Sequence, residues 1–308
     1  MKDYMVYFID SFVQESEALI SFRSASFQYG INVFEGIRAY YSSEKNDLYL
    51  FRLRDHIIRL FRSAEMLDLR FEKSMTCEFV ENKIIELIRL NNFKEDIYIR
   101  ASLFLDDDGG WISNGPVSLL LSAFPKGRSY ENMDGISCCV SSWRRINDGA
   151  FPPRIKAGPN YLNSRLALLE AKRNGFDYCV FLNDRQSVSE GPGACIFMVR
   201  DEILITPPLY ASILESINRD SFLKIARNSL GLVVEEREID RTELYIADEI
   251  FMAGTAIEIK PVCKIDHMLI NGEKVGSITK KMTDLYFSIV RNEIVEYKDW
   301  LSPVYMGR

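Results

Sequence analysis

The chain has 308 residues, 47% of them hydrophobic and 27% charged, which is enough for one large domain or two smaller ones with a buried interior. A formal net charge of −6 argues against nucleic acid or an anionic membrane as the main partner, because such binding depends on an excess of Lys and Arg. No stretch approaches the roughly 20 apolar residues that cross a bilayer. We therefore expect a cytoplasmic protein whose ligands are small molecules.

The first half of the chain predicts mixed α and β structure. Short β-rich runs at 4–9, 36–41, 47–53, 98–105 and 117–124 predict strands. Apolar residues at helical spacing predict a helix over 55–67, and Ser74 or Thr76 is a candidate cap for a second helix that ends near Leu90.

A polar stretch with Pro and Gly, 125–134, separates two strand-like runs and predicts a linker. We place an N-terminal α+β domain at 1–124, an interdomain loop at 125–135 and a C-terminal domain at 136–308. In the C-terminal domain, strands are predicted at 136–142, 178–183, 194–199, 203–206, 232–238, 249–253 and 259–265, and helices at 163–174, 216–230 and 277–297. Because strands and helices do not alternate as regular βαβ units, the fold class is α+β rather than a doubly wound sheet.

The cysteines and histidines argue against several kinds of site. Six cysteines fall at no CxxC spacing and several lie in apolar runs, which indicates buried free thiols. The two histidines, His56 and His267, are far apart and have no metal-ligand neighbours at helical spacing. No metal site is expected, nor a serine or cysteine nucleophile with a histidine base.

Lys156 and Glu190 are the candidates for chemistry, since each stands in its own Gly-Pro turn thirty-four residues apart. A lysine does covalent work only as a neutral amine or when a carbonyl traps it as a Schiff base. Pyridoxal phosphate supplies that carbonyl, and its pyridine nitrogen needs an acidic partner. Taken alone, Lys156 has an alternative as an ordinary surface lysine.

Nearby residues favour the cofactor. Tyr161 carries a hydroxyl suited to the ring oxygen, and Arg59 offers a charge for a phosphate. The helix start at Ile217 and Asn218 offers backbone N–H groups, and Thr255 adds a hydroxyl in a tight turn.

Seven stretches carry a specific resemblance over nearly the whole chain. They are 29–38, 51–60, 98–100, 141–145, 156–162, 189–191 and 247–256. In these stretches and in their order the chain resembles the branched-chain-amino-acid aminotransferases, class IV, of the fold-type IV pyridoxal-phosphate enzymes. The resemblance implies two domains, a smaller N-terminal one and a larger C-terminal pseudo-barrel that binds the cofactor.

The resemblance also implies a role for each site residue. Lys156 would form the Schiff base and shuttle the proton, Glu190 would pair with the pyridine nitrogen, and Tyr161 with the ring hydroxyl. The phosphate would be held by Arg59, Ile217, Asn218 and Thr255. The substrate α-carboxylate would meet Thr255, Ala256 and Tyr98, and its side chain would meet Phe34, Tyr29 and Arg100. Arg100 suits the distal carboxylate of glutamate or 2-oxoglutarate, with a structural ion pair as its alternative.

Three places depart from the family's pattern. Ser216 replaces a glycine in the phosphate turn, beside an added Glu215, which predicts a different turn and weaker cofactor binding. Cys195 replaces a polar residue beneath Glu190, and we expect it to alter packing there rather than to react. The run Asp106 to Asp108 stands where the family has small and apolar residues that approach the partner subunit's pocket; it favours a polar or cationic substrate unless it is simply solvated.

The leading interpretation is a pyridoxal-phosphate-dependent transamination between an L-amino acid, branched-chain or related, and 2-oxoglutarate, by a homodimer or larger homo-oligomer. A lyase or cyclase of specialised biosynthesis on the same fold is the main alternative, motivated by the three departures. D-Amino acid transamination and a cofactor-binding protein without turnover are the others. The preferred amino acid and the pathway are left open at this point.

Overall fold

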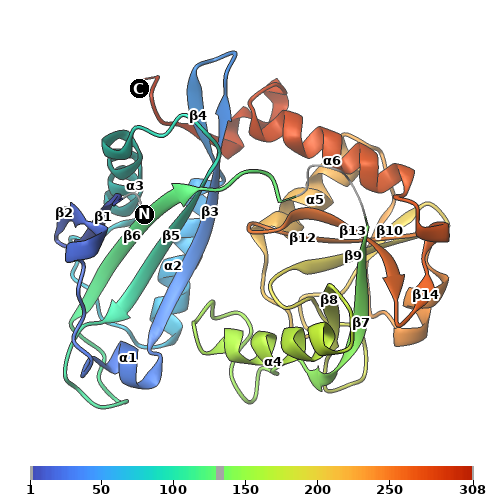
Figure 1. Ribbon diagram of the computed structural model, residues 1–308, viewed down its shortest axis with the longest axis horizontal. Coiled ribbons are helices and arrows are strands. Elements are labelled where there is room, and N and C mark those ends of the chain that lie inside the picture. The colour runs from blue at the N-terminus through green and yellow to red at the C-terminus, as the bar shows by residue number, and fades with distance from the viewer. Residues whose placement is uncertain (1–2, 130–134, 307–308) are drawn as a thin grey trace. The chain divides into compact units, whose positions relative to one another are not determined.

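The computed structural model describes residues 3–129 and 135–306 and divides into two compact units, drawn in Figure 1. The first unit comprises Met1–Gly127, Ile155–Pro159 and Ser288–Arg308, and the second comprises Arg128–Arg154 and Asn160–Phe287. Each unit is built on its own β-sheet. No helix in the described ranges is long and apolar enough to cross a membrane.

The sheet of the first unit is antiparallel throughout, in the order β15-β4-β3-β5-β6-β1-β2. Its strands are β1 (Met5–Ile9), β2 (Ser11–Gln14), β3 (Asn32–Ser42), β4 (Asp47–Phe51), β5 (Ile97–Leu105), β6 (Val117–Pro125) and β15 (Leu301–Pro303). The long central strands β3 and β5 pair from Asn32↔Phe104 to Ala39↔Ile97. Beyond the strands lie α1 (Ala25–Tyr29), α2 (Leu53–Met66), α3 (Cys77–Asn91), η1 (Glu15–Glu17) and η4 (Val295–Trp300).

Helices α2 and α3 pack against this sheet, α2 on β3 and α3 on β1 and β6. The predicted apolar stripe of α2 is confirmed, because Ile57, Leu60 and Ala64 are fully buried. Thr76, one of the two predicted caps, is the N-cap of α3, and its hydroxyl accepts the N–H of Phe79 at 3.1 Å.

The sheet of the second unit is mixed, in the order β11-β10-β9-β12-β13-β7-β8, with β14 added to β13. The pairs β10–β11, β13–β7 and β7–β8 are parallel. Its strands are β7 (Ile136–Arg144), β8 (Tyr178–Leu182), β9 (Cys195–Arg200), β10 (Ile203–Thr206), β11 (Val234–Glu236), β12 (Glu249–Gly254), β13 (Glu258–Ile265) and β14 (Met268–Leu269). Its helices are α4 (Asn160–Arg173), α5 (Ile217–Asn228), α6 (Ser277–Val290), η2 (Arg241–Ile246) and η3 (Asn271–Glu273), and the end of α6 belongs to the first unit.

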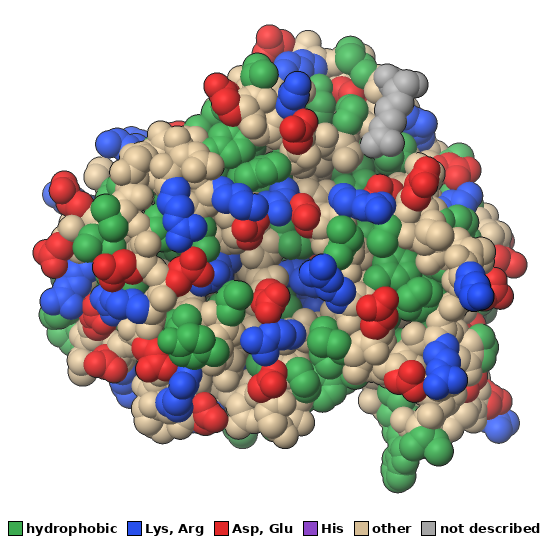
Figure 2. All heavy atoms as spheres, turned by 180° about the vertical axis from the view of Figure 1, so that it is seen from behind, with side chains coloured by type: hydrophobic (Ala, Val, Ile, Leu, Met, Phe, Trp, Pro, Cys, Tyr) green, Lys and Arg blue, Asp and Glu red, His purple; other side chains and the backbone are tan. Residues whose placement is uncertain are grey.

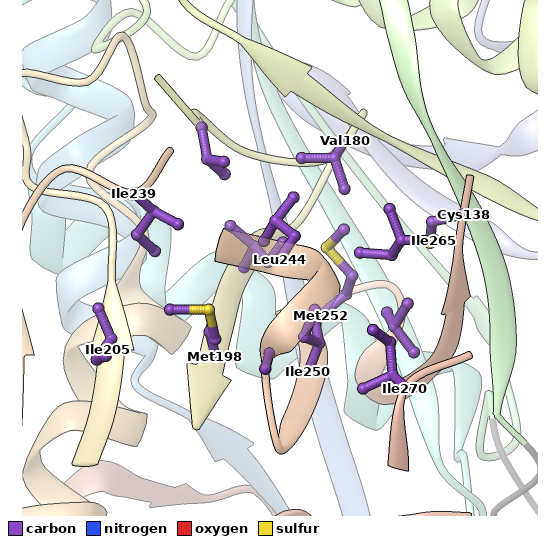
Figure 3. Close-up of a cluster of buried hydrophobic side chains, with 14 of the residues drawn as sticks. Cys138, Val180, Met198, Ile205, Ile239, Leu244, Ile250, Met252, Ile265 and Ile270 are labelled. Atoms are coloured by element: carbon purple, nitrogen blue, oxygen red, sulfur yellow. The ribbon is translucent and has the colours of Figure 1, made fainter. Parts of the chain in front are cut away.

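Both faces of the central strands in the second unit are buried. Ile196, Met198 and Met252 face an apolar cluster that Figure 3 shows as sticks. On the opposite face, Phe197 and Phe251 stack at 4.9 Å and contact Phe222 of α5, which in turn contacts Tyr286 of α6. Helix α4 covers β7 and β8. This double burial explains why β9 and β12 are nearly continuous apolar runs, each large side chain contributing about 1.5–3 kcal/mol when removed from water.

Two sequence-based expectations differ from the structure. The closing helix, expected over 277–297, ends at Val290, and Asn292 adopts φ of 60° before η4 begins. The expected C-terminal domain ran to 308, but β15 pairs with β4, so Ser288–Arg308 joins the first unit. The units separate between Gly127 and Arg128, inside the expected loop 125–135, whose residues 130–134 lie outside the described ranges.

The prediction of buried free thiols is confirmed for Cys138, Cys139, Cys179, Cys195 and Cys263. Cys77 is also free but only partly buried. Within the described ranges, no group of three or more His, Cys, Asp or Glu side chains is arranged to hold a metal ion.

Candidate active site

Lys156 is fixed to the first unit by its main chain. Among the described residues, the part of β3 that β4 covers is its end, from Ala39 to Ser42, so the beginning of that edge of β3 is open to another segment. The short segment 155–159 fills it. The N–H of Phe34 donates to the carbonyl of Lys156 at 2.9 Å, and the N–H of Lys156 donates to the hydroxyl of Ser63 at 3.2 Å. No local pattern in the sequence indicates that the segment of Lys156 belongs to a different unit from the residues before and after it.

The side chain of Lys156 lies beside the predicted substrate residues of the first unit. Its Nζ is 5.1 Å from the centre of the Phe34 ring, and the Arg100 guanidinium lies 3.7 Å from the same ring. Tyr98 stands two residues before Arg100 on β5 and therefore on the same face, and its hydroxyl lies over Gly36. The structure therefore brings Lys156, Phe34 and Arg100 together, with Tyr98 next to Arg100 on the same face of β5.

Tyr29, the remaining predicted pocket residue, is half exposed at the end of α1 and makes an edge contact with Trp111. The following residue, Gly30, has φ of 72°, a conformation that favours glycine. A Cβ at Gly30 would come within 3.1 Å of Pro159. The end of α1 thus lies against the segment that carries Lys156.

Arg59 has a partner that the sequence analysis missed, the fully buried Glu35 on β3. The Nε and Nη2 of Arg59 donate to the two oxygens of Glu35 at 2.6 and 2.8 Å, and Nδ1 of His56 lies 2.7 Å from Oε2. Burial alone would raise the pKa of Glu35, but the charge of Arg59 and the hydrogen bonds from both neighbours lower it to about 2. A Glu in a largely apolar strand was the available signal.

Glu190 is the centre of the candidate residues in the second unit. The residue is 5% exposed, its Oε1 accepts Nε of Arg145 at 2.9 Å, and both oxygens accept the N–H of Leu214 at 3.3 Å. Arg145 was not singled out from the sequence, which offers nothing to separate it from the adjacent Arg144.

Two glycines of the Glu190 turn lie next to tyrosine side chains. A Cβ at Gly193 would lie 4.0 Å from the Tyr161 ring and 3.8 Å from the Tyr178 hydroxyl, and one at Gly191 would lie 2.9 Å from the Tyr178 ring. Burial raises the pKa of Tyr178, and the neighbouring Tyr161 and Glu190 raise it further. Tyr161 and Glu190 are thus near one another, as predicted.

The start of α5 and the turn after β12 meet in the second unit. Thr255 donates to Oδ1 of Asn218 at 3.2 Å, and a Cβ at Gly254 would lie 3.0 Å from the carbonyl of Gly193. Ala256, in the same turn, accepts the Ser129 hydroxyl at 2.7 Å. Glu190, Thr255, Asn218 and the amides of the first helical turn therefore belong to one constellation.

This constellation fits a phosphate-bearing cofactor. The first N–H groups of α5, including those of Ile217 and Asn218, have no acceptor inside the helix. The buried Nδ2 of Asn218 also has no hydrogen-bond partner in the described part of the chain. Donors arranged in this way at a helix start suit an anion.

The departures at 215 and 216 have ordinary structural explanations. Ser216 adopts φ of −76°, which any residue accepts, and caps α5 by accepting the N–H of Arg219 at 3.3 Å. Ser216 therefore has the geometry of an ordinary helix cap, which does not require the different turn that was expected there. Glu215 pairs with Nε of Arg154 at 2.9 Å, which offsets its charge.

Cys195 is 3% exposed, and burial raises its pKa to about 12. Its thiol donates to the carbonyl of Ala253 at 3.0 Å. These contacts agree with the expectation of a packing residue rather than a reactive one.

The acidic run after β5 makes contacts with neighbouring residues of its own unit. Asp107 accepts the Ser113 hydroxyl, and its carbonyl accepts the N–H of Ala25 at 3.1 Å. Asp108 forms an exposed ion pair with Arg23 at 3.4 Å. Two of the three carboxylates therefore have partners in their own unit.

Comparisons with known proteins agree with this geometry. Residues 32–265 match the family model for amino-transferase class IV. A probable branched-chain-amino-acid aminotransferase of Aquifex aeolicus (strain VF5) is 39% identical over 303 residues, covering 97% of this chain and 96% of the relative.

Two solved structures cover nearly the same length. The branched-chain aminotransferase of Thermoproteus uzoniensis with norvaline is 40% identical, with a TM-score of 0.92 over 99% of this chain and 100% of that one. The T.th. branched-chain amino acid aminotransferase complexed with N-(5'-phosphopyridoxyl)-L-glutamate is 33% identical, with a TM-score of 0.91 over 98% and 99%.

The two sheets and their covering helices, matched over full length, define the two-domain architecture of the fold-type IV enzymes, and the predicted fold is confirmed. The chain belongs to the class IV aminotransferase family. It is a pyridoxal-phosphate-dependent aminotransferase of the branched-chain type, as the resemblance implied.

Proposed function

We propose that the protein transfers the amino group between a branched-chain L-amino acid and 2-oxoglutarate, with Lys156 as the residue that binds the cofactor covalently and moves the proton. The observation that carries the proposal is the main-chain anchoring of Lys156 five residues before Tyr161. A trans chain of that length spans at most about 18 Å, which is short enough for both side chains to serve one cofactor.

The second unit supplies the groups that hold the cofactor. When bound, pyridoxal phosphate supplies an aldehyde that condenses with amines and a ring that withdraws electrons from the substrate α-carbon. Glu190 would hold the ring nitrogen and Tyr161 the ring hydroxyl. The amides of Ile217 and Asn218 and the Thr255 hydroxyl would bind the phosphate.

The first unit supplies the proton carrier and a further charge. Once the substrate amine has displaced it, the neutral amine of Lys156 would take the proton from the substrate α-carbon and return it to a carbon two bonds away, acting first as general base and then as general acid. Arg59 would add its charge to the phosphate site. Its bidentate pair with Glu35 supports this role by holding the guanidinium in one orientation.

Phe34 and Arg100 would let one pocket accept both substrates. The Phe34 ring and Tyr29 offer apolar surface to a branched side chain, while Arg100, stacked on Phe34, offers a charge to a distal carboxylate. Tyr98, Thr255 and Ala256 would receive the α-carboxylate. The relatives crystallised with norvaline and with a phosphopyridoxyl-glutamate support this double use.

A homodimer is part of the proposal, and an exposed apolar surface of the first unit supports it. Phe22, Phe27, Trp111 and Ile112 are 65–87% exposed on α1, the residues before it and the loop after β5. Figure 2 shows hydrophobic side chains gathered on the part of the molecule that carries α1. Apolar surface of this kind commonly marks a protein interface. A cytoplasmic location remains a prediction.

Light scattering tests the assembly. Trp111→Ser should shift the protein toward monomer, whereas Val295→Ser, another exposed apolar position of the first unit, should not. A monomeric wild-type protein would contradict the proposed homodimer.

The catalytic proposal is tested with a panel of amino acids. L-leucine, L-isoleucine and L-valine should each bleach the visible absorption of the bound cofactor and yield a 2-oxo acid, and continued turnover should require 2-oxoglutarate. Turnover without an acceptor, or faster bleaching by L-lysine, would instead support the lyase or the cationic-substrate alternative.

A further inference from the structure

Arg145 forms a buried ion pair with Glu190, the proposed partner of the cofactor ring. Its Nε donates to Oε1 at 2.9 Å, and both side chains are 7% exposed. The chain's neighbouring arginine behaves differently, because Arg144 is exposed and donates to the surface residue Gln186. Two consecutive arginines thus have opposite environments.

The position of Arg145 is fixed from several sides. Its N–H donates to the carbonyl of Leu182 at 2.9 Å, its Nη1 donates to Oδ1 of Asn163 at 3.4 Å, and its guanidinium lies 5.9 Å from the Phe181 ring centre. A guanidinium held in this way keeps its charge at one place beside the carboxylate.

Glu190 does not depend on Arg145 alone for its orientation. Leu214 donates its N–H to both carboxylate oxygens, and the carbonyl of Glu190 accepts the N–H of Phe181 at 2.9 Å. The distinctive contribution of Arg145 is therefore its positive charge.

That charge bears on the ring nitrogen of the cofactor. A carboxylate beside the nitrogen favours the protonated ring, because opposite charges attract. A guanidinium on the same carboxylate offsets part of the negative charge, and in a buried site little water screens the effect.

We propose that Arg145 is a positioning residue that limits how strongly Glu190 holds a proton on the ring nitrogen of bound pyridoxal phosphate. The inference rests on the proposed contact between Glu190 and that nitrogen. Arg145 moderates the electron withdrawal by the ring through Glu190, without touching the cofactor itself.

The test compares two cofactors on the full-length apo-enzyme. One is pyridoxal phosphate and the other is its deaza analogue, in which a C–H replaces the ring nitrogen. Dissociation constants for both are measured at neutral pH from cofactor absorbance, and their ratio reports only what the ring nitrogen contributes. A general loss of packing weakens both cofactors and leaves the ratio unchanged.

Arg145→Met removes the charge at similar length. Glu190 then attracts the ring proton without an offset, so the preference for pyridoxal phosphate over its analogue should rise by roughly tenfold or more. Arg145→Lys keeps the charge and should restore most of the wild-type ratio. Arg144→Met is the matched control and should leave the ratio unchanged.

Removing one partner of a buried pair is destabilising, so Arg145→Gln serves in the same comparison if the methionine variant does not fold. An unchanged or smaller ratio in the neutral variants would overturn the inference and leave Arg145 as a structural ion pair. Glu190→Gln tests the proposed role of Glu190 separately from that of Arg145. It should lower the ratio, and if it does not, the proposed role of Glu190 itself fails. In a Glu190→Gln background, Arg145→Met should have no further effect on the ratio.

Discussion

Cys195 on β9 lies beside Ser216, the N-cap of α5: burial raises the pKa of the Cys195 thiol, and the side chain of Ser216 lowers it again in part. The Ser216 hydroxyl also caps the helix, and the Cys195 thiol continues the chain of contacts to the carbonyl of Ala253. Two residues that separately depart from the family's pattern therefore form a single local arrangement. Their proximity favours repacking at one place over a change of chemistry.

This arrangement predicts what the cap contributes. Ser216→Ala should lower the free energy of unfolding by about 1 kcal/mol, because α5 loses its side-chain acceptor, while Ser216→Gly should cost only a few tenths. Urea denaturation of the apo-protein measures both. Thr76→Ala, which removes the corresponding cap of α3, is the matched control and should cost a similar amount. A Ser216→Ala variant as stable as wild type would show that the hydroxyl does not act as a cap.

Lys156→Ala should abolish covalent attachment of the cofactor and lower the transamination rate by at least about 10²–10⁴-fold, the usual contribution of a positioned acid and base. Stability should change little, because the bonds of Lys156 to Phe34 and Ser63 involve its main chain. Borohydride reduction followed by mass measurement of the labelled peptide detects the attachment. Recovery of the label at another lysine would contradict the assignment.

Gly36 predicts a steric test of the substrate face. A Cβ there would clash with the hydroxyl oxygen of Tyr98 and lie 2.7 Å from its ring carbon, so Gly36→Ala must displace the tyrosine. We expect KM for the amino acid to rise about tenfold, which is the loss of one hydrogen bond to a charged group, while cofactor content is kept. Steady-state kinetics decide the point. Gly127→Ala, where no atom lies within 4 Å of the added carbon, should behave as wild type.

Acid should destabilise the first unit through Glu35 and His56. The pKa of Glu35 falls from its ordinary 4.5 to about 2, so the stability it adds is complete above pH 4.5 and is lost as the pH falls towards 2. Burial lowers the pKa of His56 below its ordinary 6.5, so protonation of His56 likewise opposes folding as the pH falls below 6.5.

Urea midpoints between pH 7 and pH 2.5 measure this loss. Glu35→Gln should be less stable at pH 7, since it breaks a buried pair, and should show a weaker dependence between pH 4.5 and 2.5. The exposed Glu44→Gln should retain the wild-type pH dependence. An unchanged slope in Glu35→Gln would mean that other carboxylates control acid unfolding.

The sequence predicted most of the regular structure, because the apolar residues follow the periodicity of a helix or of a strand in most elements. The stripe of α2, the cap at Thr76 and the apolar runs of β9 and β12 all carry local signals. The short elements β2, α1, β14 and β15 were missed. Such elements depend on a distant partner, as β15 depends on β4, and local patterns do not identify partners.

For the site, the sequence identified the residues better than it predicted their positions in the fold. Spacing and resemblance selected Lys156, Glu190 and Thr255, yet nothing in the sequence indicated that Lys156 would pair with β3. The buried partners Glu35 and Arg145 were missed for a related reason. A charge in a strand or beside a second arginine becomes distinctive only when its burial and its counter-ion are known.

The return of residues 288–308 to the first unit has a consequence for biosynthesis. Domains generally begin to fold as they leave the ribosome, N-terminal ones first. Here the first sheet cannot gain its edge strand β15, nor β3 its partner segment 155–159, until chain far downstream has emerged. Until then the nascent first unit has part of β3 and one edge of β4 unpaired, and unpaired strand edges can pair with other chains.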